Sequence, residues 1–496
     1  MRKRFEQQLS LGVIPISEVV INMKSRHQLP PLLKALQHVF VTPSLNKAVF
    51  DLLENHILGD KQKTGRPGMS LWEILVLGLI RLNLDVDYDF LLDQANEHKT
   101  VRGILGVGKS DFTDGREYNY QTVIDNVRLL DEDIIRKVND LVVGESHGLI
   151  KKKEGVEVLD LNTKVDSYVV ESNIHFPTDL NLLWDSGRKC LDMVVHLLGA
   201  GLDLPNWGKH KNWQRKLKNA YRKVSEIHRK KGKNYKARLL SSTKAYLDLS
   251  GRLSAKTKVS MLLGMKALKA DTLTAREERC LKDLGYYLEM LDKHIDLVGR
   301  RILKGEKIPH AEKVFSIFED HVEWLNKGKL HRKVELGHAV SIATDQHHMI
   351  VDFEVMVGMA DAKAGELLGK RLIEKYGKSC NLESISFDRG YYSSLLKSYL
   401  SKHFKQVIMP KRGRKTAAEE EEEGQEAYKV LRRAHSAVES NINQLEHHGV
   451  NRCPDKGLKG FKRYVALGVL SYNLHRLGKL LNTMSCQTII RRRKVA

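Results

Sequence analysis

The sequence predicts an α/β fold: a mixed β-sheet covered by helices, split by a long helical insertion and preceded by an all-α N-terminal region. Two observations predict this class. The spacing of apolar residues changes from helical to strand-like near Gly155, returns to helical, and becomes strand-like again after residue 330. Beyond that point strand-like runs alternate with helical ones, which indicates a sheet covered by helices. The 496 residues suffice for about three domains at roughly 150 residues each.

Composition narrows the class of protein. Hydrophobic residues make up 42% and charged residues 29% of the chain, which is ordinary for a soluble globular protein and excludes a disordered or collagen-like chain. We find no uncharged apolar run near 18 residues, so no membrane span is expected. The five cysteines are far apart and form no C-x-x-C pair. A reducing, cytoplasmic location is therefore expected.

The charge indicates a polyanionic partner. Subtracting 61 Asp and Glu from 83 Lys and Arg leaves a net charge of +22. Lysine and arginine gain affinity for nucleic acid by releasing counterions from its phosphates. Nucleic acid is the expected partner, and the alternative is a generally basic soluble protein.

The N-terminal region is expected to be helical from about Leu29 to Val143. Its clearest helix start is Ser70, which can form a capping box with Glu73. Further helices are expected at Tyr88–Glu97 and Tyr120–Val143. Such helices form either a helix-turn-helix DNA reader or a plain bundle, and the sequence leaves both open.

Strand-like segments follow. Val156–Glu171 is rich in β-branched residues, and the chain then returns to helical spacing from about Leu182 to Leu297. Two apolar runs, Val334–Ala343 and Met349–Met359, flank a polar turn and predict a β-hairpin. The later elements are expected as a helix at Asp361–Tyr376, a strand at Ser384–Phe387, a helix at Ser393–His403, a strand at Gln406–Met409, a polar loop with the glutamates 419–423, a helix at Ala427–His448 and a last helix at Lys459–Asn482 that packs on the sheet.

The resulting order, strand, insertion, strand, strand, helix, strand, helix, strand, helix, is that of the ribonuclease H-like fold. The predicted regions are 1–150 (helical and DNA-binding), 151–185 (first part of the catalytic domain), 186–330 (basic helical insertion), 331–482 (remainder of the catalytic domain) and 483–496 (basic tail).

Three acids occur where this order would bring them together. Asp166 lies on the first strand, Asp388 ends a later strand, and Glu439 lies on the helix after the last strand. Carboxylates are the ligands that Mg²⁺ prefers, and two such ions can promote phosphodiester cleavage. Asp160 is six residues before Asp166 and would face the same side of the strand, so spacing alone allows either.

Several motifs resemble the DDE transposases of bacterial insertion sequences, in particular the ISNCY-type group. The motifs are residues 165–179 from Val165-Asp-Ser to Pro-Thr-Asp179, Asp388-Arg-Gly-Tyr-Tyr-Ser393, His435-Ser-Ala-Val-Glu-Ser-Asn-Ile-Asn443, Lys459-Gly-Phe-Lys-Arg-Tyr464, Gly65-Arg-Pro67 and Glu335-Leu-Gly-His338. The similarity covers about residues 60 to 482. It implies a ribonuclease H-like catalytic domain, Mg²⁺ or Mn²⁺ in its place, and the triad Asp166, Asp388 and Glu439. It also implies cleavage of double-stranded DNA at element ends and joining to a target, by a homodimer on paired ends.

The sequence departs from that family around the third acid. Many relatives carry Tyr seven and Arg four residues before the Glu, and Lys seven after it. Here those positions are Arg432, His435 and Glu446. Arg432 or Arg433 is expected to supply the phosphate-contacting cation instead, and Arg389 in the Asp388 motif is a further candidate.

The strongest charge cluster lies in the insertion. Residues 209 to 238 contain 13 Lys or Arg against Glu226 alone. Trp207, Trp213, Tyr221 and Tyr235 are interleaved, so contact with phosphate and stacking on bases are both expected; the alternative is a solvated basic helix. The DNA-binding candidates here are Lys209, Lys211, Arg215, Lys216, Lys218, Arg222 and Lys223.

The function expected is DNA transposition through a metal-dependent carboxylate triad. Two alternatives remain open on the sequence: a metal-dependent nuclease that cuts without joining, and a catalytically inactive DNA-binding descendant. The glutamates 419–423 are expected to be solvated, or to mimic DNA beside the site.

Overall fold

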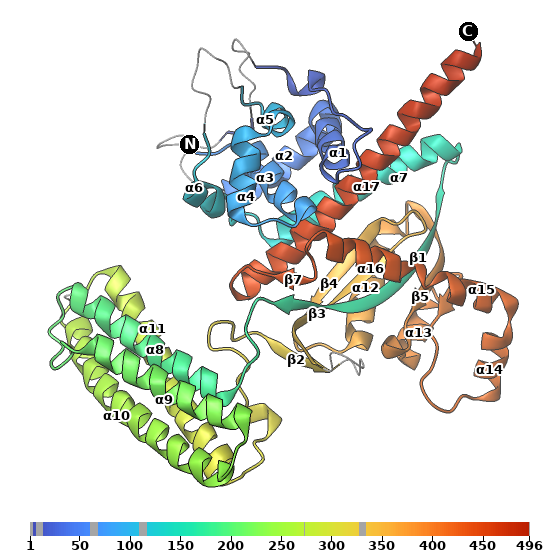
Figure 1. Cartoon of the computed structure of the whole chain (residues 1–496). Helices are drawn as coiled ribbons and strands as arrows, with labels where there is room; N and C mark the ends of the chain where they lie inside the picture. Colours follow the sequence, from blue (N-terminus) through green and yellow to red (C-terminus); the bar gives the residue numbers. More distant parts are fainter. Residues whose placement is uncertain are drawn as a thin grey trace. The chain divides into compact units, whose positions relative to one another are not determined.

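A computed structural model describes residues 3–5, 13–59, 68–108, 117–271, 273–326 and 334–495, with side chains to residue 487. The chain forms two compact units (Figure 1), one made of residues 1–173 and 323–496 and the other of Ile174–Val322. The first contains the sheet and the N-terminal helices. The Gly65-Arg-Pro67 motif lies outside the described residues.

The N-terminal part of the first unit is helical, as predicted. Its helices are α1 (Leu29–Val41), α2 (Pro43–Ile57), α3 (Leu71–Leu84), α4 (Tyr88–Glu97), α5 (Lys99–Leu105), α6 (Tyr120–Val127) and α7 (Glu132–Glu154). The predicted capping box of Ser70 and Glu73 is present at the start of α3. The single helix predicted over Tyr120–Val143 is wrong, because the chain turns between α6 and α7, where Asp131 caps α7.

The sheet is mixed and open. Its strands are β1 (Leu159–Ser172), β2 (Glu323–Asn326), β3 (Val334–Thr344), β4 (Ile350–Met356), β5 (Cys380–Phe387), β6 (Gln406–Ile408) and β7 (Arg452–Cys453). The order is β2-β3-β1-β5-β6, with β4 also paired to β3 and β7 to β1. β3 and β4 form the predicted hairpin and β3 runs antiparallel to β1, whereas β5 runs parallel to β1 and β6 parallel to β5.

Gly337 shows why a small residue is needed within β3. It is the register partner of Glu171 on β1. A Cβ atom at this position would collide with the carbonyl oxygen of Val170. The close approach of the two strands therefore requires glycine in the Glu335-Leu-Gly-His338 motif.

The helices after β4 are α12 (Asp361–Tyr376), α13 (Ser394–Leu400), α14 (Ala417–Gly424), α15 (Glu426–Ala434), α16 (Ala437–His447) and α17 (Gly457–Val495), with a short 3₁₀ turn, η4, at Arg389–Tyr391. Two predictions are wrong here. The chain breaks at His435 and Ser436 instead of continuing as one helix to His448. The predicted glutamate loop is the helix α14, because Thr416 and Glu419 form a capping box.

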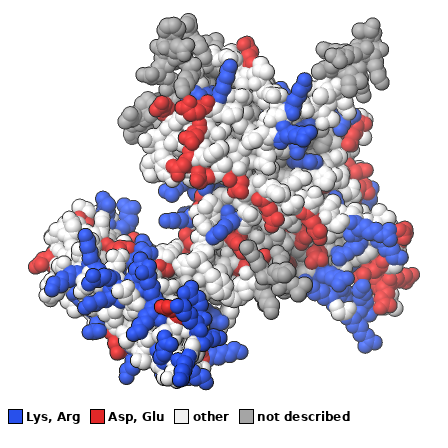
Figure 2. All heavy atoms as spheres, in the orientation of Figure 1, with Lys and Arg blue, Asp and Glu red and all other residues white. Residues whose placement is uncertain are grey.

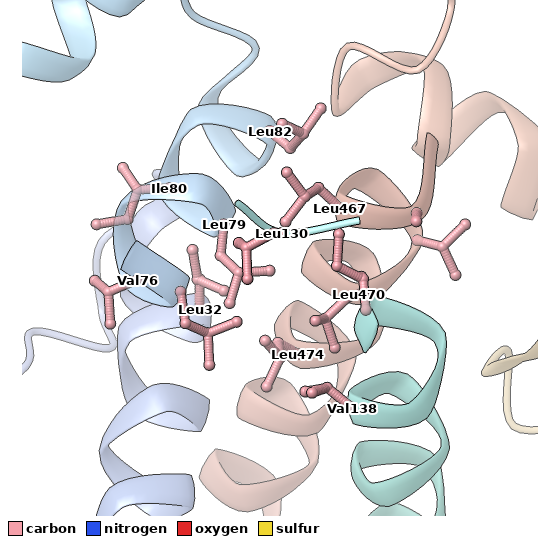
Figure 3. Close-up of a cluster of buried hydrophobic side chains, with 14 of the residues drawn as sticks. Leu32, Val76, Leu79, Ile80, Leu82, Leu130, Val138, Leu467, Leu470 and Leu474 are labelled. Carbon is pink, nitrogen blue, oxygen red and sulfur yellow. The ribbon is translucent and has the colours of Figure 1, made fainter. Parts of the chain in front are cut away.

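α17 has a different role from the one predicted. It continues to Val495 instead of ending at Asn482 before a tail. Its apolar residues contact α1, α3 and α7 as well as β4. Figure 3 shows Leu467, Leu470 and Leu474 of α17 between Leu79 of α3 and Val138 of α7. α17 therefore joins the N-terminal helices to one face of the sheet in a single apolar core, instead of only covering the sheet.

The second unit is built of helices, as predicted for the insertion. They are α8 (Asp179–Gly199), α9 (His210–Lys230), α10 (Tyr235–Lys269) and α11 (Ala275–Val298). Leu217 and Val224 of α9 are fully buried with Leu253 of α10 and Leu291 of α11 in one cluster. Among the described residues, no helix is long and apolar enough to cross a bilayer.

Candidate functional site

The alternation of side chains along β1 divides its residues between two faces. Leu161 and Val165, at odd positions, lie in the core beneath α12, whereas Tyr168 and Val170, at even positions, lie in the core shared with α17. Asp166 is at an even position and therefore faces the α17 side. Lys164 shares that face and is therefore a neighbour of Asp166. It was not among the predicted site residues, although the period of two along a strand is a sequence signal that identifies it.

Asp166 lies within β1, beside Asp388, which directly follows the end of β5. Val165 on β1 is the register partner of Phe387 on β5, and the two strands are parallel. The next residue of each strand is Asp166 and Asp388, respectively. Adjacent strands lie roughly 5 Å apart, so the register brings these two predicted acids to adjacent positions.

The helix that carries Glu439 lies over the same face. Its N-terminal side is fixed by His435, whose Nδ1 is 2.9 Å from the hydroxyl of Ser386 on β5. Val438 and Leu445 of α16 are buried in the core with Tyr168. Glu439 lies four residues beyond His435, in the first turn of α16 after the break in the chain. Glu439 directly follows Val438, so it lies on a helix that packs against β1.

The Glu439 side chain itself is exposed to solvent. Within the described residues, no three His, Cys, Asp or Glu side chains stand close enough to hold a metal ion together. Asp388 is also 49% exposed, which leaves both side chains room to turn. The carboxylate oxygens fit the chemistry of Mg²⁺, but Glu439 would have to turn toward the two aspartates.

Asp160, the alternative first acid, lies near the other end of β1. It is exposed, and its Oδ1 accepts a 2.8 Å hydrogen bond from Asn381 at the start of β5. Six residues of strand separate it from Asp166, or about 20 Å. Asp160 is therefore too far from Asp388 to share an ion with it.

Arg432 lies close to the end of β5. Its guanidinium donates a 3.2 Å hydrogen bond to the carbonyl of Phe387 and lies 3.9 Å from Asp388. Arg433 points elsewhere: it is 75% exposed and 3.6 Å from Glu426. Arg389 is exposed in η4. Of the three predicted cations, Arg432 has the geometry to contact a phosphate held at Asp388.

His435 is a neutral group in the segment between α15 and α16. Burial, together with the nearby positive charge of Arg432, lowers the pKa of His435 to about 4. The ring is therefore uncharged at pH 7. Its contact with Ser386 gives it a positioning role, in which it fixes α16 against the end of β5.

Helix α14 stands after the Asp388 motif and carries the glutamate run. Glu419 accepts hydrogen bonds from Tyr392 at 2.9 Å and from Lys411 at 3.0 Å. Glu422 pairs with Lys397 and Glu423 with Lys415, both at 2.6 Å. Figure 2 shows blue and red side chains intermixed over this part of the chain. The glutamates neutralise lysines that follow Asp388 in the chain.

The basic residues of the second unit form a surface. All 13 Lys and Arg from 209 to 238 are exposed, including the seven predicted DNA contacts, which are Lys209, Lys211, Arg215, Lys216, Lys218, Arg222 and Lys223. We call this set the α9 surface, and Figure 2 shows the blue side chains gathered on this unit. Its single acid, Glu226, pairs with Lys230 at 2.6 Å. The remaining cations are available to a polyanion.

The interleaved aromatic residues do not all share this exposure. Trp207 is 2% exposed and donates a 2.8 Å hydrogen bond to Ser260. Tyr221 stacks on Trp184, with ring centroids 6.3 Å apart. The expectation of base stacking is therefore wrong for Trp207, which belongs to the core of the unit.

No family model, curated protein or solved structure matches the chain. Its function is therefore inferred from the residues of the site.

Proposed function

We propose that this protein is a DDE-type DNA transposase with a ribonuclease H-like catalytic domain, whose acids are Asp166, Asp388 and Glu439. The observation that carries the proposal is the register of β1 and β5, which sets Asp166 beside Asp388 beneath the helix of Glu439. The proposal joins this register to the sequence motifs that single out the same acids, and it requires the exposed Glu439 side chain to turn toward the two aspartates.

The sheet supports the fold assignment. A central strand flanked by an antiparallel hairpin on one side and two parallel strands on the other, in the order β4-β3-β1-β5-β6, is the arrangement expected of that fold. The long helical unit enters between β1 and β2. The fold alone does not indicate the reaction, so the proposed reaction is argued from the three acids.

Mg²⁺ bound by the three carboxylates would activate a water or a DNA 3′-hydroxyl and stabilise the leaving oxygen. The chain's own groups act around that reaction. Arg432 would hold the phosphate beside Asp388, and His435 would keep α16 in register with β5. The α9 surface would bind double-stranded DNA through its phosphates, and two copies of the chain would hold paired ends.

The test is a cleavage and strand-transfer assay on DNA that carries the sequences flanking the gene. Wild type, Glu439→Gln and Asp160→Asn are each incubated with Mg²⁺, with Mn²⁺ and with EDTA. We expect joined product from the wild type and Asp160→Asn with either metal, and none from Glu439→Gln. Asp160→Asn is the matched control because its carboxylate lies on the same strand but away from Asp388.

The alternatives give different products. Cleavage without joining on every substrate would identify a nuclease. Tight binding with no cleavage by the wild type would identify a DNA-binding descendant. Light scattering on the complex with paired ends tests the dimer, and a single copy on two ends would contradict it.

A further inference from the structure

A cleft of about 900 Å³ opens in the first unit, between the N-terminal helices and the segment from β7 to the start of α17. Tyr120 and Arg128 line it from α6 and the residue after it, and Arg452 and Lys459 from β7 and α17. Residues 128 and 452 are 324 positions apart (452 minus 128). Folding therefore assembles this cleft from distant parts of the chain.

The floor of the cleft is a buried charge network. Asp455 accepts hydrogen bonds of 2.8 Å from both Arg81 and Arg463. Arg81 also lies over the ring of Tyr88, with its guanidinium carbon 4.1 Å from the centroid. Arg81 is 3% and Arg463 8% exposed, so two buried guanidiniums share one carboxylate. With two guanidiniums and one carboxylate, the floor keeps an excess of positive charge.

The walls add exposed cations. Six Lys or Arg but three Asp line the cleft. Arg452, Lys456 and Lys459 are exposed, and none of them forms an ion pair with another described residue. On the opposite wall, formed by the N-terminal helices, Tyr120 is 41% exposed and lies edge to face with Tyr88. Free cations opposite an exposed aromatic ring are typical of a surface that follows a nucleic-acid backbone.

The cleft lies further along the strand that carries Asp166. Arg452 on β7 is the register partner of Glu171 on β1. Glu171 is five residues beyond Asp166, or about 17 Å along the strand. Successive phosphates of one DNA strand are about 3.4 Å apart along the helix axis, so this distance corresponds to about five nucleotides.

We propose that this cleft binds the sugar-phosphate backbone of duplex DNA about five nucleotides from the phosphate that is cleaved. The inference rests on the proposed function for the position of the scissile phosphate. The cations are spread along one open wall at residues 452, 456 and 459, which fits successive phosphates of a strand better than one small phosphorylated ligand.

The experiment compares two triple variants by fluorescence anisotropy with a labelled duplex that carries one flanking sequence. The cleft variant is Arg452→Gln, Lys456→Gln and Lys459→Gln. The control, Lys363→Gln, Lys370→Gln and Lys378→Gln, removes equal charge from exposed positions on and just beyond α12, which covers the other face of the sheet. We expect the cleft variant to bind at least about 10-fold more weakly and its salt slope to fall by about 2.7, or 0.9 for each of three contacts.

A modified duplex locates the contact. One neutral methylphosphonate placed about five nucleotides from the cleavage point should weaken binding by wild type several-fold and should leave the cleft variant unaffected. Equal losses for both proteins, or equal losses for the cleft and control variants, would overturn the inference. A third outcome would overturn the inference in favour of a small ligand. In it, a nucleoside triphosphate binds wild type but not the cleft variant, while the two proteins bind DNA with equal affinity.

The two proposals fail differently. If wild type and the cleft variant cut and bind DNA equally, the cleft inference is wrong and the transposase proposal stands. If wild type neither binds nor cuts DNA, both are wrong. Equal urea unfolding midpoints of the two triple variants confirm that both are folded.

Discussion

The α9 surface and the cleft beside α17 both present positive charge, but the protein builds them in different ways. On the α9 surface the exposed cations extend along α9 and the turn after it to the start of α10, and no buried ion pair among the described residues supports them. In the cleft, exposed cations surround the buried network of Arg81, Asp455 and Arg463. Charge density along the sequence therefore reveals the first kind of surface, whereas only the folded chain reveals the second.

The largest expected effect tests the buried network. Asp455→Ala would leave two buried guanidiniums without their shared carboxylate, so the free energy of unfolding should fall by about 3 to 5 kcal/mol. Urea unfolding measures this free energy. Asp455→Asn keeps one oxygen acceptor, so its free energy of unfolding should fall by less. Equal stability of wild type and Asp455→Ala would mean that the network of Arg81, Asp455 and Arg463 does not stabilise the fold.

A smaller effect is expected on the α9 surface, and it should appear in binding instead of stability. Reversing Lys216, Arg222 and Lys223 to Glu removes three cations, so the salt slope of DNA binding should fall by about 2.7. The free energy of unfolding should change by no more than about 0.5 kcal/mol, because all three are exposed. An unchanged salt slope would show that this surface does not contact phosphate.

The third prediction concerns pH and the unit that contains the cleft. Burial lowers the pKa of His475 to about 3, and Lys479 and His448 add repulsion. The folded pKa is below the unfolded value of about 6.5, so the stability from the neutral ring is complete above pH 6.5 and is lost as the pH falls toward 3. Between pH 7 and 5 the wild type should lose about 2 kcal/mol more than His475→Asn.

Urea unfolding at the two pH values measures this difference. His475→Asn is a suitable comparison because its amide can replace the contact of the ring Nδ1 with the carbonyl of Gln28, 3.1 Å away. If the free energy of unfolding falls equally in both proteins between pH 7 and 5, protonation of the His475 ring does not destabilise the folded state.

The smallest expected effect is on helix α14. Glu422→Gln with Glu423→Gln frees Lys397 and Lys415 from their partners, so DNA binding at low salt should strengthen, by about threefold. The control is Glu374→Gln with Glu383→Gln, which removes the same charge from the region of α12 and β5. Equal strengthening by both pairs would assign the effect to net charge instead of to α14.

Much of the fold could be predicted from local patterns. The hairpin of β3 and β4, the capping box at Ser70 and the helical insertion all follow from short-range spacing. The errors have physical causes. Nothing in residues 427–448 indicates the break at His435, because its contact with Ser386 is tertiary. The partners of α17 could not be chosen, because an apolar stripe fits helices and a sheet equally well.

The candidate site was predictable in part. The alternation along β1 allowed either Asp160 or Asp166. The resemblance to the transposase motifs favoured Asp166, and the pairing of Val165 with Phe387 sets Asp166 beside Asp388. The α9 surface was visible as charge density, but the burial of Trp207 was not, because the indole bonds to Ser260 on another helix. The cleft had no signal in the sequence, since its walls are hundreds of residues apart.

The ends of the helical unit also define how this chain can change its length. Glu171 and Glu323 both pair with Gly337, one on each side of β3, so the chain leaves and re-enters the sheet roughly 10 Å apart. Three or four extended residues span that distance. The whole of Ile174–Val322 therefore occupies the place of a short connection between two strands. A version of the chain with a short loop in its place would keep every strand pairing described above.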